Sequence, residues 1–126
     1  MCTKDDLKIG ICGKKSMVVS KQTLATNLGN EKIAVFSTPN MIAFMEKTAR
    51  ESVACYLKDN CTTVGIAIDI KHINSVKENE TVTCFTELIE IHKKRLVFKC
   101  KVVNDDIIIG EGIQQRYIVN IDEFMN

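Results

Sequence analysis

Three side chains in this sequence combine a chemically useful type with an unusual position: Thr38, Glu46 and His72. Glu46 stands at the edge of the apolar stripe of a predicted helix, where a carboxylate faces partial burial. Burial raises a carboxyl pKa unless something stabilises the charge, and such a group can act as a nucleophile or a general base. The alternative is an ion pair with Arg50, one helical turn later, on a solvated face.

His72 ends a run of alternating apolar residues, so its ring is expected on the same face as those side chains. A lone histidine at a strand end can equally be a satisfied or solvated residue. Gly65 interrupts the same run, which indicates either a bulge or a close approach by a ligand or another backbone. Thr38 fits a helix N-cap, which also places its hydroxyl where unpaired helix amides favour anionic groups.

The other chemically capable residues form no recognisable site. The second histidine, His92, lies in a lysine-rich turn, and neither histidine has a cysteine or carboxylate at ligand spacing. We therefore expect no metal, and no cofactor motif such as a P-loop or G-x-G-x-x-G occurs. The Lys93-Lys94-Arg95 cluster is typical of a solvated turn, although it could attract a phosphate-bearing ligand.

A long helix must position Glu46, and the sequence predicts it over residues 40–58. Thr38 is predicted to be the N-cap and Pro39 the first helical residue, where its missing N–H costs nothing. About 19 residues at ~1.5 Å per residue give nearly 30 Å, roughly the diameter of a domain of this size. The predicted apolar stripe consists of Met41, Ile42, Met45, Ala49, Ser52, Val53, Tyr56 and Leu57, and Phe44 and Cys55 widen it.

Strands are predicted on both sides of this helix, over residues 16–23, 64–72, 81–91, 95–103 and 107–119. Residues 24–32 are expected to form a loop or short helical turn. The apolar parity of the third strand shifts along its length, which indicates a bulge. Short connections join the last three strands, so they should form an antiparallel meander.

The element order of one strand, a long helix and four strands predicts an α+β protein with a single domain over residues 1–126. One helix can serve the whole sheet only by packing across its concave face. This is the outline of the hot-dog fold, an antiparallel sheet wrapped around one long central helix. A ferredoxin-like or cystatin-like sandwich is the architectural alternative.

Composition limits the partners of this domain. The chain has 126 residues, with 17 Lys+Arg and 16 Asp+Glu for a net charge of +1, so we expect no nucleic-acid partner. No apolar run approaches the roughly 20 residues that span a bilayer, and we expect no membrane association. The N-terminus lacks an apolar signal region, so we expect a cytoplasmic protein whose six cysteines are free, reduced and mostly packing residues.

Three segments together resemble a known family. The chain reads VFSTPNMIAFMEKTA, then TTVGIAIDIKHI, then RLVFKCKVVNDDIIIGEGIQQRYIV. These segments contain a T-P…E motif, a V-G…H motif and a closing G-x-G…R strand, in order and at matching spacing. Over about residues 16–120 the sequence resembles the fluoroacetyl-CoA thioesterase-like family of hot-dog proteins.

The resemblance implies an acyl-CoA substrate and assigns roles to individual residues. The family's catalytic threonine, glutamate and histidine fall on Thr38, Glu46 and His72, and its V-G glycine falls on Gly65. The N–H of Gly65 would hold the thioester carbonyl oxygen. The resemblance also implies a homodimer, or a dimer of dimers, with sites near the subunit interface.

The sequence departs from the family in two loops. The stretch 74–80 lacks the usual T-P-x-G turn, and residues 23–35, a plausible lid, contain no aromatic residue. We therefore expect a small or medium acyl-CoA rather than fluoroacetyl-CoA as substrate. The alternative is a non-catalytic acyl-CoA-binding or metabolite-sensing module; lyase or dehydratase activity on the same scaffold is disfavoured because it usually needs a differently placed histidine and acid.

Overall fold

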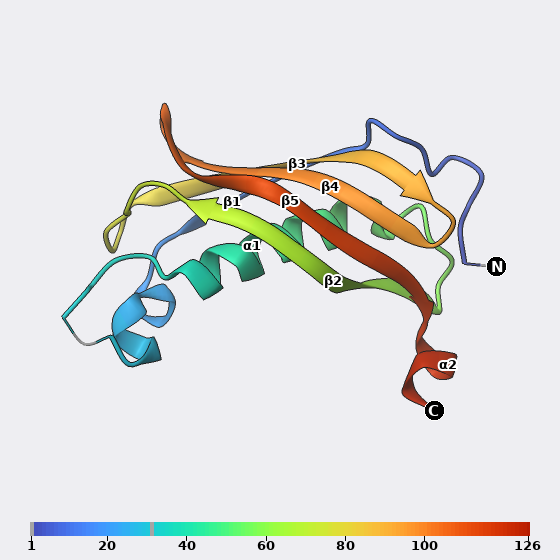
Figure 1. Cartoon of the computed structure of the whole chain (residues 1–126), viewed down its shortest axis with the longest axis horizontal. Helices are drawn as coiled ribbons and strands as arrows, with labels where there is room; N and C mark the ends of the chain where they lie inside the picture. Colours follow the sequence, from blue (N-terminus) through green and yellow to red (C-terminus); the bar gives the residue numbers. More distant parts are fainter. Residues whose placement is uncertain (1, 31) are drawn as a thin grey trace.

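The computed structural model describes residues 2–30 and 32–126, which form one five-stranded antiparallel sheet and one long helix (Figure 1). In chain order the elements are β1 (Cys12–Val18), the 3-10 turns η1 (Lys21–Thr23) and η2 (Ala25–Leu28), α1 (Thr38–Ala54), β2 (Cys61–His72), β3 (Thr81–His92), β4 (Arg95–Asn104), β5 (Ile107–Asn120) and the short α2 (Ile121–Met125). None of these helices is long and apolar enough to cross a membrane. The predicted α+β class is confirmed.

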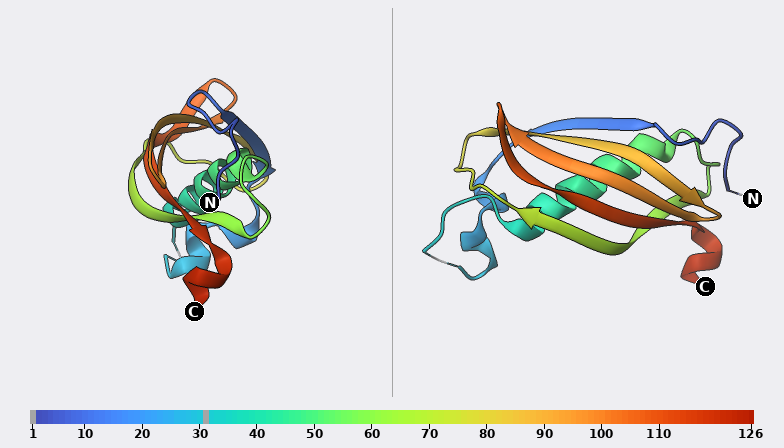
Figure 2. Two further views of the ribbon diagram at one scale, coloured as in Figure 1. Left: turned by 90° about the vertical axis from the view of Figure 1, so that its right-hand side faces the viewer. Right: turned by 45° about the horizontal axis from the view of Figure 1, so that its top comes forward.

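The strands follow the order β1-β3-β4-β5-β2, so β1 and β2 are the two edges of the sheet. The predicted meander of β3, β4 and β5 is confirmed, with tight turns in which Lys93 and Asp105 adopt positive φ angles of 57° and 51°. Viewed from the end, the sheet curls around α1, as Figure 2 shows. The helix therefore occupies the concave face, as expected.

The core lies between α1 and the concave face of the sheet. The helix buries six residues there: Met41, Phe44, Met45, Thr48, Ala49 and Val53. Alternate residues of the central strands meet them, including Leu88, Leu96 and Phe98, none of which is accessible to solvent. The predicted stripe is confirmed in its buried members and Phe44 widens it, because burying one face of the helix against the sheet removes apolar surface from water. The predicted widening by Cys55 is wrong, since Cys55 follows the last helical residue and is exposed.

The start of α1 differs from the prediction by one residue. Ser37 is the N-cap, and its Oγ accepts a hydrogen bond from the backbone N–H of Asn40 at 3.1 Å. Thr38 is the first helical residue, so the predicted N-cap was wrong. Both neighbouring hydroxyls satisfy the chemical requirement of a cap, and the backbone conformation selects Ser37. The helix also ends at Ala54 rather than near residue 58.

The strand predictions hold best where turns bound them. The first strand covers Cys12–Val18 rather than residues 16–23, since Gly13 lies within it and Lys21–Thr23 forms η1. The register shifts between Leu88 and Glu90, which confirms the bulge expected in β3. A second shift, between Gly65 and Ala67 in β2, confirms the bulge reading of the Gly65 region.

The prediction that all cysteines are reduced is wrong for one pair. Cys2 and Cys61 form a disulfide across a sequence separation of 59 residues. The N-terminal arm returns to the end of α1, where the backbone N–H of Lys58 donates to the carbonyl of Cys2 at 2.8 Å. Spacing rules detect local cysteine pairs, whereas tertiary structure creates this one. Cys84 and Cys100 are core residues, as expected.

Candidate active site

Thr38 and His72 meet at the end of the molecule where α1 begins and β2 ends. Thr38 Oγ1 and His72 Nδ1 are 2.7 Å apart and share a hydrogen bond. Burial lowers the pKa of the His72 imidazole below its usual value because desolvation penalises the charged ring. His72 Nε2 is buried without a hydrogen-bond partner among the described residues. The pair thus presents a neutral imidazole with one nitrogen fixed by a hydroxyl.

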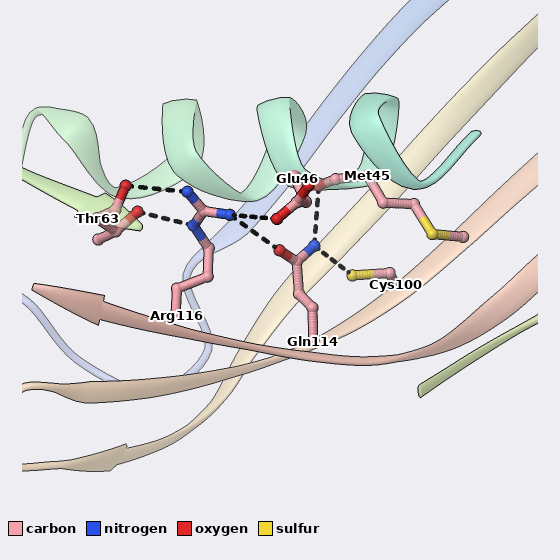
Figure 3. Close-up of polar contacts among 6 residues, drawn as sticks. All are labelled: Met45, Glu46, Thr63, Cys100, Gln114 and Arg116. Atoms are coloured by element: carbon pink, nitrogen blue, oxygen red, sulfur yellow. Dashed lines mark hydrogen bonds and ion pairs between the residues drawn. The ribbon is translucent and has the colours of Figure 1, made fainter. Parts of the chain in front are cut away.

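Glu46 is paired with a residue from the opposite face of the core. Its Oε2 lies 3.3 Å from the Nη1 of Arg116 on β5, while the Glu46 side chain remains 34% exposed (Figure 3). The alternative pairing with Arg50 is not seen. Because the carboxylate has a buried cation on one side and solvent on the other, it is both held in place and accessible.

Arg116 is fixed by a network beneath the helix (Figure 3). Its Nε and Nη2 donate to the side chain and the carbonyl of Thr63, at 2.8 and 2.9 Å, and its Nη1 also donates to Gln114 Oε1 at 3.4 Å. Gln114 Nε2 in turn donates to the carbonyl of Met45 at 2.9 Å, on the helix that carries Glu46. Burial lowers the pKa of Arg116, and the Glu46 carboxylate opposes that change.

Gly65 lies next to the Glu46 carboxylate. A Cβ atom at position 65 would overlap Glu46 Oε2, so any larger residue would displace the carboxylate from its position beside Arg116. The bulge beside it, at Ile66, interrupts the regular pairing of β2 with β5. Of the two alternatives that the sequence left open, the bulge is confirmed, and the group that approaches Gly65 is the Glu46 side chain rather than another backbone.

The four predicted site residues form two separate pairs within one chain. Thr38 contacts His72, and Glu46 contacts Gly65. Eight helical residues separate Thr38 from Glu46, or about 12 Å along the axis. Both pairs face the side of α1 that lies along β2, the edge strand of the sheet.

A pocket of about 330 Å³ opens beside Thr38 and His72. Its apolar wall comes from the segment before α1 and from the residue after β2, and includes Ile33, Val35 and Ile73. Ile33 and Ile73 are 45% and 51% exposed, which is unusual for large apolar side chains at a polar site. Glu31, in the predicted lid segment, lies outside the described residues.

The residues that hold Glu46 in place were not predicted from the sequence. Arg116 appears only as the last letter of the closing motif, and Thr63 and Gln114 were not identified. The position of Arg116 within a buried strand pattern could have indicated a buried ion pair, because buried cations require partners.

Arg95 of the basic cluster pairs with Glu90 at 3.1 Å, a contact within the sheet. Among the described residues, no group of three or more His, Cys, Asp or Glu could hold a metal ion.

Comparisons with known proteins point to one family. A family model described as fluoroacetyl-CoA-specific thioesterase matches residues 18–122. The fluoroacetyl-CoA thioesterase of Streptantibioticus cattleyicolor is 28% identical over 90 residues, which cover 71% of this chain and 65% of that protein. The alignment thus spans slightly less than two thirds of that relative.

Solved structures agree over almost the whole chain. A point mutant of the fluoroacetyl-CoA-specific thioesterase superposes with a TM-score of 0.90 at 25% identity, covering 96% of this chain and 94% of that one. A hot-dog-like protein from Thermanaerovibrio acidaminovorans gives 0.86 at 19% identity, over 94% and 88% of the two chains. The hot-dog prediction is confirmed, and the chain belongs to the fluoroacetyl-CoA-specific thioesterase family.

Proposed function

We propose that this protein is an acyl-CoA thioesterase that hydrolyses a small or medium acyl-CoA thioester. The proposal rests on the Glu46 carboxylate, which pairs with Arg116 and lies next to the backbone of Gly65, where no side chain fills the space. A thioester carbonyl is electrophilic and its thiolate leaves readily, so one positioned carboxylate suffices as a nucleophile or a general base. The relatives named as thioesterases support the same reaction.

Gly65 and the start of α1 supply the complementary positive charge. The N–H of Gly65 is assigned to the thioester oxygen, which becomes an oxyanion as the nucleophile adds. The N-terminus of α1 adds a favourable helix dipole near Thr38. Because Gly65 carries no side chain, the carbonyl can approach the backbone and the carboxylate together.

The second pair, Thr38 and His72, is assigned to the leaving group. Its neutral imidazole, with Nδ1 fixed by the Thr38 hydroxyl, can position water through Nε2, or relay to the departing sulfur the proton that Glu46 removes from the attacking water. This step requires the pair to lie near Glu46. Within one chain about 12 Å of helix intervenes, so one subunit does not complete the site.

A two-fold dimer along β2 would complete it. Within the described residues, β2 pairs with β5 only, and its other edge is open. Suppose that two β2 strands pair in antiparallel fashion with Asp69 opposite its own copy. Counting along the strand from Asp69, His72 is the third residue in one direction. Gly65 is the third paired residue in the other direction, because the bulged residue Ile66 is not paired. The partner subunit's His72 then lies opposite Gly65, which joins the two pairs into one site.

An acyl-CoA panel with thiol release as the readout tests the activity. Glu46→Gln should lower kcat at least a hundredfold, since it removes the base but keeps the shape. Glu51→Gln is the matched control, because Glu51 lies on the same helix and pairs with Lys15 at 2.9 Å, away from the site. Equal activity of Glu46→Gln and wild type would refute the assignment, and saturable CoA-ester binding without turnover would indicate a binding module.

Mixed dimers test the shared site. Glu46→Gln and His72→Ala chains, each inactive alone, should recover about a quarter of the wild-type activity when unfolded together and refolded at equal amounts. Half of the dimers are then mixed, and each mixed dimer holds one intact site. No recovery would show that each site is built from a single chain.

Cross-linking tests the register independently of activity. Asp69→Cys should form a subunit-linking disulfide on mild oxidation, because the residue at a two-fold axis faces its own copy. Wild type, which already exposes Cys12 and Cys55, is the control. Equal linkage in wild type and Asp69→Cys, or none in Asp69→Cys, would contradict this pairing.

A further inference from the structure

We propose that the acyl group of the substrate is a neutral aliphatic chain of roughly four to eight carbons, bound in the pocket beside Thr38 and His72. This inference rests on the proposed thioesterase function and names its substrate class. We refer to the pocket, lined by Ala25, Ile33, Val35, Phe36 and Ile73 next to the Thr38–His72 pair, as the acyl pocket.

The size of the acyl pocket exceeds a two-carbon acyl group. The pocket measures about 330 Å³. A fluoroacetyl group has four non-hydrogen atoms, and at the ~30 Å³ that a water molecule occupies in the liquid it would fill only about 120 Å³. Although the pocket is open to solvent on one side, its remaining volume has room for several methylene groups.

The chemistry of the lining selects an uncharged chain. Among the described residues that line the pocket, none is Lys, Arg, Asp or Glu. The amide of Asn74 is already committed, since its Nδ2 donates to the carbonyl of Ile108 at 2.8 Å. A terminal carboxylate on the acyl chain would lose water there without gaining a cation, and that desolvation is costly.

Two exposed isoleucines provide apolar surface for binding the acyl chain. Ile33 precedes α1 and Ile73 follows β2, so the segments that carry Thr38 and His72 each contribute one isoleucine to the pocket. They are 45% and 51% exposed, and an aliphatic chain between them would remove apolar surface from water on both sides. The position beside His72 connects this chain to the reacting thioester.

A series of straight-chain acyl-CoA esters tests the proposal on wild-type protein. We expect kcat/KM to rise about threefold per methylene from acetyl to hexanoyl, as each methylene leaves water. Butyryl-CoA should exceed succinyl-CoA, which has the same carbon count and a terminal carboxylate, at least a hundredfold. Fluoroacetyl-CoA as the best substrate, or equal rates for butyryl and succinyl esters, would overturn the proposal while leaving the thioesterase function intact.

Substitutions at the pocket wall locate the effect. Ile33→Trp and Ile73→Trp should each lower kcat/KM for hexanoyl-CoA at least tenfold while changing acetyl-CoA less than threefold, because they shorten the pocket. Ile73→Arg should raise succinyl-CoA relative to butyryl-CoA about tenfold by supplying the missing cation. Ile9→Trp, at an exposed isoleucine on the N-terminal arm, is the control.

These outcomes separate the two proposals. Hydrolysis of no CoA ester would refute the thioesterase function itself. Hydrolysis with no response of chain-length preference to Ile33→Trp and Ile73→Trp would refute only the acyl pocket. Thermal unfolding of each variant distinguishes a changed pocket from a damaged fold, and both isoleucines are exposed enough that we expect unchanged stability.

Discussion

The two edges of the sheet are built in opposite ways. The outer edge at β1 is short and carries Lys14 and Lys15, and the latter ties the strand to α1 through an ion pair with Glu51 at 2.9 Å. The edge at β2 is five residues longer, contains a bulge, and exposes Ile66 and Ile68 by 51% and 39%. Lysines on an edge strand discourage pairing, and β2 also carries one, Lys71, but its greater length and its exposed isoleucines favour pairing.

The difference indicates which edge performs the function. All four predicted site residues lie on β2 or on the side of α1 along it, and none lies near β1. An edge that both exposes apolar side chains and carries half-sites is suited to a second copy of the chain. The predictions below perturb one edge and use the other as reference.

The largest effect is expected from a charge at the centre of the β2 edge. Ile68→Asp would place a carboxylate of each subunit in the proposed interface, where unpaired charges are costly. We expect dissociation and at least a thousandfold loss of kcat, measured by light scattering and thiol release.

Val18→Asp is the matched change on the other edge. Val18 is 56% exposed at the end of β1, and its replacement should leave the dimer mass unchanged and the activity within twofold of wild type. A monomeric Val18→Asp variant, or a dimeric and active Ile68→Asp variant, would reverse our assignment of the two edges.

The second largest effect is expected on the free energy of unfolding, through the bonds that attach each edge strand to the rest of the protein. Cys61, the first residue of β2, is bound covalently to Cys2, and this bond closes a long loop in the unfolded chain. Cys2→Ser should lower the free energy of unfolding by about 3 kcal/mol, and a reducing agent should lower wild type by the same amount. Lys15→Met, which loosens β1, should cost less than about 1 kcal/mol, as surface ion pairs contribute little. Equal losses in denaturant titrations would contradict this ranking.

A smaller loss is expected from the cation under Glu46. Arg116→Met keeps the volume but leaves the carboxylate without its partner, so we expect unfolding free energy to fall by about 2 kcal/mol and kcat to fall tenfold or more. Adding Glu46→Gln should restore part of the stability but none of the activity. A double variant no more stable than Arg116→Met would mean that Arg116 acts mainly through Thr63 and Gln114.

The smallest effect is a pH dependence of stability from His72. Burial lowers the pKa of His72 in the folded chain, so the unfolded chain takes up a proton first as pH falls through about 6.5. Stability should therefore be unaffected above that pH and decrease below it. Urea titrations at pH 5.5 and 7.5 should show a smaller difference for His72→Gln than for wild type. His92→Gln, at the exposed histidine, should behave like wild type.

Local patterns predicted most of the fold. The strands β3, β4 and β5 and the body of α1 were found to within a few residues, because periodicity and turn residues act over short distances. The errors lie at element ends, where two adjacent hydroxyls compete for a cap or a glycine sits inside β1. The short α2 was not predicted.

The sequence predicted the candidate reactive residues of the site but not the residues that hold them in place. Glu46 and His72 were conspicuous because each breaks a local pattern. The pair of Glu46 with Arg116 joins residues 70 positions apart, and the Cys2–Cys61 bond joins residues 59 apart. No helical or strand period connects such positions, so only the folded chain shows them. The roles of Thr38, Glu46, Gly65 and His72 in catalysis stay predictions until the variants are measured.

The contact between Glu46 and Gly65 also limits how this protein can diverge. The carboxylate lies where a Cβ atom at position 65 would stand, so a side chain there would push Glu46 away from Arg116. A library randomised at both should return active clones only with glycine at position 65 and a carboxylate at position 46. Folded clones should additionally include small residues at position 46 combined with alanine or serine at position 65. Descendants that lose the reaction would be expected to fill position 65 first, because removal of Glu46 makes that substitution sterically free.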